Sequence, residues 1–60
     1  QEGEILKLIV QTKKKIQRGD TQEKIADDLM EEESVIQPIY EAIKQYPDKT
    51  KEEIYKMLNL

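Results

Sequence analysis

The chain contains, at residues 21–47, the sequence TQEKIADDLMEEESVIQPIYEAIKQYP. Its first part places Ile25, Ala26 and Leu29 on one face of a helix, and its second part carries an apolar stripe at the spacing i, i+3, i+4, i+7 and i+10. The residues of this stripe are Ile36, Ile39, Tyr40, Ile43 and Tyr46. Because a short acidic turn separates the two patterns, and Ala26 is small enough to let two helices approach closely, the segment predicts a helix-turn-helix-like pair.

An amphipathic segment precedes this pair and predicts a first helix. Ile5, Ile9 and Ile16 recur in it at helical spacing. Thr12 fills the gap in this apolar face, and Gly19 follows where a left-handed C-cap is expected. Because the connections between predicted helices are only a few residues long, successive helices are expected to pack directly on one another.

Capping residues indicate where the second and third helices begin. Asp20 is expected to cap the second helix, with Glu23 three residues later in a capping-box arrangement. Ser34 follows the acidic run 31–33 and is expected to cap the third helix, whose positive end the acidic run favours. Pro38 is compatible with this helix if it lies in the first turn, where few backbone donors have helical partners.

A fourth helix is expected after Pro47, which stops the third. The Thr50 hydroxyl and Glu53 form a second capping box at its start. The residues of its buried face are Ile54, Tyr55 and Leu58. The predicted helices lie at about residues 4–18, 20–30, 34–46 and 50–59. The expected fold class is all-α, a small four-helix bundle with a helix-turn-helix-like central pair.

Length and composition limit what the chain can do. Its 60 residues predict one helical domain, residues 1–60, with a marginal core, because a short chain buries a smaller share of its surface. It has no cysteine and no histidine, which excludes disulfides and the usual zinc ligands, so self-association is the expected extra support. No apolar run approaches the roughly 18 to 20 residues of a membrane span, which favours a cytoplasmic protein. The start at Gln1 indicates a piece of a longer protein or a processed chain.

No group of residues predicts catalysis. Ser34 is the single serine and, without a histidine base, is interpreted as a helix cap. The carboxylates at 27–28 and 31–33 are interpreted as solvated charge on helix and turn positions. The two glycines, Gly3 and Gly19, form no phosphate-binding loop. We therefore expect no enzyme activity, no cofactor, no metal and no small-molecule substrate for this chain.

Charge is distributed unevenly along the chain. Residues 1–18 have five basic side chains against two glutamates, residues 20–34 have seven acidic side chains against one lysine, and residues 35–60 are balanced. Neighbouring segments of opposite charge favour helix-to-helix contacts within or between chains. A nucleic-acid-binding protein would normally show one continuous basic surface.

DNA binding is the alternative function, because a helix-turn-helix pair commonly places its second helix in the major groove. Here three glutamates, which phosphates repel, precede that helix, so DNA binding is disfavoured. The outward residues of the helix are Gln37, Glu41, Lys44 and Gln45. The candidate contacts to nucleic acid or to an acidic partner are Lys7, Lys14, Arg18 and Lys44. On helix 1, the simpler interpretation of these charges is a solvated basic face near a helix terminus.

The first helix carries more apolar surface than one face can hold. Its apolar cluster comprises Ile5, Leu6, Leu8, Ile9 and Val10. Leu6 and Val10 point about 100° away from Ile5 and Ile9, so part of the cluster is expected to meet a second copy of the chain or a preceding domain. The expected interaction residues are Ile5, Leu6, Ile9, Val10 and Lys13. The alternative is that the last helix folds over this side.

Three motifs carry a resemblance to a known family: KKIQRGDT at 14–21, IADDL at 25–29 and IQPIYEAIK at 36–44. They resemble the C-terminal helical segment of bacterial recombination-promoting nucleases, in the PD-(D/E)XK transposase-related family that is common in Firmicutes. Residues 1–4, QEGE, resemble the end of the Gln/Glu/Gly repeats that often precede that segment. The resemblance covers almost the whole chain.

The resemblance implies a C-terminal module that follows a nuclease domain and serves assembly or contact with the target. None of the family's nuclease residues falls within this sequence, so no catalytic role carries over. In some members the C-terminal part is also made as a separate small protein that holds the full-length nuclease in check. A chain of that kind would act as an antitoxin by pairing with the same module in the nuclease. The expected partner of the chain is therefore a second copy, in a homodimer, or a nuclease domain.

Overall fold

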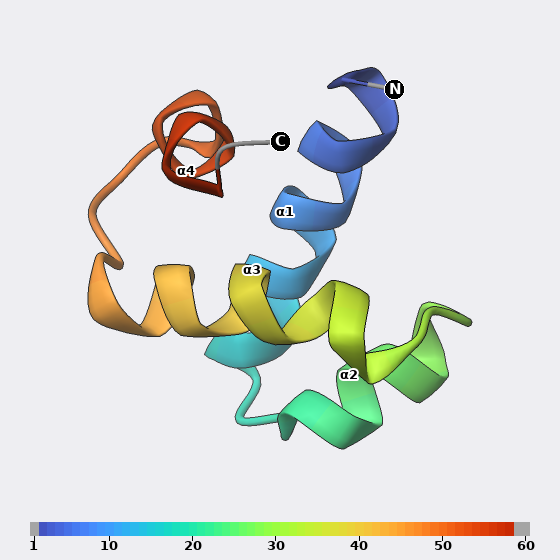
Figure 1. Ribbon diagram of the computed structural model, residues 1–60. Coiled ribbons are helices and arrows are strands. Elements are labelled where there is room, and N and C mark those ends of the chain that lie inside the picture. Colours follow the sequence, from blue (N-terminus) through green and yellow to red (C-terminus); the bar gives the residue numbers. More distant parts are fainter. Residues whose placement is uncertain (1, 59–60) are drawn as a thin grey trace.

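Residues 2–58 are described by the computed structural model, and this part of the chain forms four α-helices and no strands (Figure 1). The helices are α1 (Glu2–Gln17), α2 (Gln22–Asp28), α3 (Glu33–Gln45) and α4 (Lys51–Leu58). The all-α class and the number of helices are confirmed. The largest difference from prediction is α2, which is shorter at both ends, while residue 59 of the predicted last helix lies outside the described range.

Helix α3 is the centre of the fold, because it packs against each of the other three helices (Figure 1). Its residue Ile36 joins Ile25 and Ala26 of α2 in one buried cluster. On the other side of α3, a second buried cluster contains Ile9, Ile39, Ile43 and Ile54. Ile16 of α1 packs against both clusters and links them. The predicted stripes of α2 and α3 therefore form the core.

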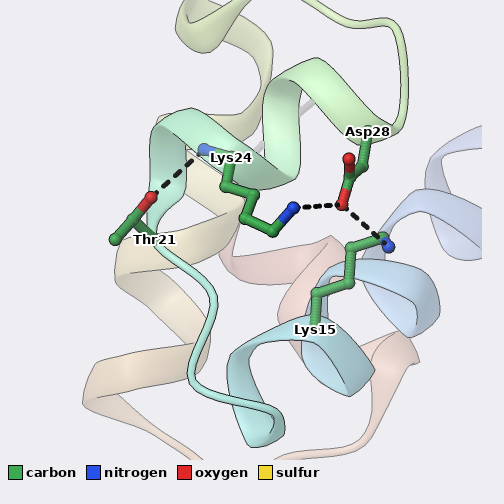
Figure 2. Close-up of polar contacts among 4 residues, drawn as sticks. All are labelled: Lys15, Thr21, Lys24 and Asp28. Carbon is green, nitrogen blue, oxygen red and sulfur yellow. Dashed lines mark hydrogen bonds and ion pairs between the residues drawn. The ribbon is translucent and has the colours of Figure 1, made fainter.

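The end of α1 decides where α2 begins. Gly19 has the left-handed φ of +91°, as predicted, and its N–H donates to the Ile16 carbonyl at 2.9 Å. The Asp20 N–H donates back to the Lys15 carbonyl at 3.0 Å, which completes a Schellman motif. Asp20 is therefore still part of the α1 terminus, and its prediction as the cap of α2 is wrong. Thr21 is the cap instead, since its hydroxyl oxygen accepts from the Lys24 N–H at 3.2 Å (Figure 2).

One carboxylate joins α2 to α1. Asp28 Oδ2 lies 3.4 Å from Lys15 Nζ and 3.6 Å from Lys24 Nζ (Figure 2). Partial loss of hydration would raise the pKa of Asp28, but the ammonium groups of Lys24 and Lys15 outweigh it and hold the pKa below its ordinary value. Because exposed ion pairs contribute little, the position of α2 depends mainly on its buried contacts with Ile36.

The start of α3 differs from prediction. The first helical bonds run from the Val35 and Ile36 N–H groups to the Glu32 carbonyl, at 2.9 and 3.3 Å, so Glu32 is the N-cap. Ser34 lies inside the first turn, and its prediction as the cap is wrong. Because the helix starts earlier, Pro38 falls in the second turn and not in the first. The Ser34 carbonyl loses its helical donor there, and water can replace it because Ser34 is exposed.

The turn between α2 and α3 contains Met30 in a left-handed conformation, with φ of +57°. The Met30 N–H donates to the Asp27 carbonyl at 3.1 Å and the Glu31 N–H to the Ala26 carbonyl at 2.9 Å. This is a second Schellman motif, with methionine where α1 has glycine. A left-handed residue with a Cβ costs about 1–2 kcal/mol, and the Met30 side chain is 91% exposed, so packing within the chain does not offset that cost.

The other end of α3 requires one more correction. Tyr46, predicted in the buried stripe, is 42% exposed. The helix ends at Gln45, and Tyr46 is the C-cap with φ of −131°, so its side chain leaves the direction of the stripe. Pro47 follows directly, as expected for a residue that stops the helix.

The capping box at the start of α4 is confirmed. The Thr50 N–H donates to Glu53 Oε1 at 2.8 Å, and the Glu53 N–H donates to the Thr50 hydroxyl at 3.2 Å. The hydrogen bond from the Thr50 backbone holds the pKa of Glu53 below its ordinary value of 4.5. At pH values above 4.5, the ionised Glu53 carboxylate therefore stabilises the folded chain. This stabilisation is lost as the pH falls through the lowered pKa of Glu53.

We expect the Glu53→Gln variant to lose less stability at acid pH than the parent chain. Glutamine keeps the capping geometry and does not titrate in this range. Urea unfolding followed by circular dichroism, at a series of pH values from neutral to below 4.5, measures this. Glu52→Gln removes an exposed carboxylate from the same turn and serves as the control. Equal acid sensitivity in the two variants would show that the capping carboxylate does not couple stability to pH.

Candidate interaction surfaces

Among the hollows on the described surface, two have the most apolar walls. The first, called here the apolar groove, has a volume of about 330 Å³. Its lining comprises Ile5, Ser34, Val35, Pro38, Ile39 and Leu58. The groove lies where the first turns of α1, the first half of α3 and the end of α4 meet. Val35 is the most exposed of its aliphatic residues at 37%, so a partner could reach apolar surface here.

The second hollow, called here the lysine cup, has a volume of about 240 Å³. Its lining comprises Ile9, Val10, Lys13, Lys14, Gln17, Lys49, Lys51 and Ile54. Ile9 and Ile54 are buried and Val10 is half-buried, so the floor is apolar. Four lysines from α1, from the α3–α4 loop and from the start of α4 surround that floor, and no carboxylate lines it within residues 2–58. The cup therefore favours an occupant with an apolar tip and negative charge.

The third feature lies around the α2–α3 turn and is called here the acidic corner. It consists of four acidic side chains and one methionine. It comprises Asp27, Met30, Glu31, Glu32 and Glu33. Glu31 is half-buried and the other members are exposed. The corner runs from the end of α2 into the first turn of α3, while Lys49 and Lys51 of the cup follow the last turn of α3. Since α3 has 13 residues, about 20 Å of helix separates the corner from Lys49 and Lys51.

The predicted interaction residues of α1 do not form one surface. Ile5 lines the apolar groove, whereas Ile9, Val10 and Lys13 line the lysine cup. Leu6 packs against the core cluster of α1, α3 and α4.

One chain covers the apolar flank of α1 in part, and the contact of the remainder with a second copy or a preceding domain stays a prediction. Ile9 is buried, and the other members of the cluster are half-buried. These half-buried members are Ile5, Leu6, Leu8 and Val10. The reason is that α3 and α4 both pack on α1, so its apolar arc meets two helices and not one. This is the alternative in which the last helix folds over the extra side.

The predicted basic contacts are all exposed, and one belongs to the cup. Lys14 lines the cup, and Lys44 lies on α3 with its Nζ 5.9 Å from the centre of the Tyr40 ring. Lys7 lies on α1, and Arg18 lies just after its end.

Sequence reasoning missed the residues that complete these surfaces. Lys49 and Lys51 lie in a segment of zero net charge, which hid their contribution to a basic region. Neither Val35 nor Met30 was among the predicted interaction residues. The Schellman bonds around Met30 follow the same chain geometry as those at Gly19, but methionine gives no sequence signal for a left-handed residue.

Two other observations concern the described part of the chain. It contains no group of three or more acidic side chains placed to hold a metal ion. No helix in it is long and apolar enough to span a membrane. Comparison of the chain with family models, with curated proteins and with solved structures finds no match.

Proposed function

We propose that this chain is a non-catalytic protein-interaction module that associates with a second copy of itself through the apolar groove. The observation that supports the proposal is the groove, where aliphatic side chains from three helices surround an open hollow of about 330 Å³. Covering such surface is favourable at roughly 25 cal/mol per Å² of apolar area. A chain of this length gains from that term because its own core is small.

A symmetric pair suits this groove. In a two-fold dimer the same patch of each copy faces the other, so Val35 of one copy can enter the groove of its partner and the reverse contact forms at the same time. The groove has one polar side chain, Ser34, so few hydrogen-bonding groups would be buried without partners. Each contact therefore occurs twice in the dimer, which allows a small patch to stabilise the association of two chains.

The Val35→Glu variant is expected to weaken dimerisation by at least about tenfold, because a charged carboxylate would be buried in an apolar contact. Sedimentation equilibrium over a range of concentrations measures the effect. Met57→Glu is the matched control, since Met57 is 42% exposed, lies on α4 and lines neither hollow. A monomeric parent chain at high micromolar concentration, or equal weakening by both substitutions, would contradict the proposal.

The resemblance to recombination-promoting nucleases supports a more specific proposal. The module would follow a nuclease domain in a cytoplasmic protein. Pairing of two modules would assemble the nuclease, or the module would dock on the nuclease domain. A separately made copy would occupy the module of the full-length protein and act as its inhibitor. This antitoxin role uses the same groove contact and needs no catalytic residue in the chain.

DNA binding by the α2–α3 pair is the weaker proposal. The arrangement of the two helices suits it, but the acidic corner lies at the start of α3, where phosphates would be repelled. Lys49 and Lys51 of the lysine cup follow the other end of α3, so they do not add positive charge at its start.

A further inference from the structure

The residues that line the lysine cup restrict the chemistry of a possible occupant. Four lysine side chains line the cup together with an apolar floor, so an occupant that carries negative charge is favoured. A simple anion would leave Ile9, Val10 and Ile54 uncovered, whereas an apolar side chain alone would leave the lysines unpaired. The best occupant therefore has an apolar tip flanked by carboxylates.

The acidic corner has that composition. Met30 is 91% exposed and is held outward by the two backbone bonds of its Schellman motif, with Asp27 and Glu31–Glu33 beside it. The left-handed conformation would be easier for glycine, so the fold of this chain gains nothing from a methionine here. Methionine is unbranched and flexible, which suits it to fill an irregular hollow on another surface.

The sizes agree. A water molecule occupies about 30 Å³ of liquid, so a cup of about 240 Å³ has room for the Cβ, Cγ, Sδ and Cε atoms of one methionine. The charges agree as well, because four lysines would face four carboxylates. Lys51 also begins α4, whose helix dipole adds positive potential at the same place.

We propose that the lysine cup binds the acidic corner of a second copy of this chain, with Met30 seated on the floor of Ile9, Val10 and Ile54. Within one chain the acidic corner lies at the start of α3, whereas Lys49 and Lys51 of the cup follow its end, so a chain does not bring its own Met30 between these two lysines. The contact joins unlike surfaces of two copies, so it is head-to-tail and extends into rings or chains of subunits. It uses neither Val35 nor the apolar groove, so it goes beyond the proposed function and can fail independently of it.

The experiment uses Val35→Glu as the parent chain, because this substitution weakens groove pairing. Sedimentation velocity at low ionic strength is expected to show species that grow with concentration beyond a dimer. At about 1 M salt, where the Debye length falls to about 3 Å, these species are expected to dissociate. A parent that stays monomeric under both conditions would overturn the proposal, whatever the result for the groove.

Two charge-reversal variants of this parent test which surfaces meet. The cup variant carries Lys14→Glu and Lys51→Glu, and the corner variant carries Glu31→Lys and Glu32→Lys. Each alone is expected to be monomeric with an unchanged helical circular-dichroism spectrum. An equal mixture is expected to form a dimer and nothing larger, because only one intact cup and one intact corner remain. A mixture that stays monomeric, or variants that still assemble alone, would overturn the proposal.

Met30→Gly separates assembly from folding. Glycine relieves the left-handed conformation, so resistance to urea is expected to stay the same or rise. Assembly is nevertheless expected to weaken about tenfold or more, since the apolar anchor of the contact is gone. Unchanged assembly in this variant would overturn the assignment of Met30 to the cup. Binding of the cup to an added acidic peptide or to DNA, without self-assembly of the parent, would identify another occupant and also overturn the proposal.

Discussion

Replacing Ile36 with alanine is expected to lower the free energy of unfolding by about 2–5 kcal/mol. Ile36 is fully buried between α3 and α2, where it contacts Ile25 and Ala26. Alanine would remove three carbon atoms and leave a cavity that the two helices can close only in part. A chain of this length has a total stability of roughly 3–9 kcal/mol, so the variant would be unfolded to a measurable extent at room temperature.

Thermal unfolding followed by circular dichroism measures this effect, with an expected decrease in Tm of about 8 °C or more. Ile36→Val is the graded control, for which a loss of about 0.5–1.5 kcal/mol is expected. Gln37→Ala changes the next residue along α3, which is exposed, and is expected to shift stability by no more than about 0.5 kcal/mol. Similar losses for Ile36→Ala and Gln37→Ala would contradict the position of α2 against α3.

The second large effect is expected in the opposite direction. Thr12 on α1 is fully buried, and its hydroxyl oxygen has no hydrogen-bond partner among the described residues. A buried polar group without a partner costs about 1–3 kcal/mol of desolvation. Valine has nearly the same shape and no hydroxyl, so Thr12→Val is expected to raise the free energy of unfolding by about that amount.

Urea unfolding of Thr12→Val and Thr12→Ser provides the comparison. Serine keeps the unpaired hydroxyl and loses a buried methyl group, so it is expected to lower stability by about 1 kcal/mol. A loss of stability in the valine variant would mean that the hydroxyl donates or accepts a hydrogen bond in the folded chain. The pair of variants therefore separates the cost of the hydroxyl from the packing of the side chain.

Local pattern was enough to predict most of the core. Ile36, Ile39 and Ile43 are buried, as their spacing on α3 indicated, and Thr12 fills the gap in the α1 stripe. The capping box of Thr50 and Glu53 was predictable for the same reason, since its partners are three residues apart. Such features depend on neighbours within one helical turn, which the sequence lists directly.

Prediction failed where two local signals competed within a few residues. Asp20 and Thr21 are both good capping residues, and the choice between them depended on how the α1 terminus used the Asp20 N–H. Ser34 lost its predicted role because the backbone became extended at Glu32, two residues earlier. Tyr46 continued the apolar spacing, but the helix had already ended. In each case the periodicity was right and the boundary was wrong.

The sequence by itself determined that this protein is helical, where its helices lie and which side chains form their apolar faces, because these depend on contacts three or four residues apart. Only the tertiary structure decided that α4 joins α3 in covering α1, and that Lys49 and Lys51 meet Lys13 and Lys14 around one cup. These contacts join residues more than 30 positions apart. The path of the chain in space sets which distant surfaces meet, and no spacing within a helix encodes it.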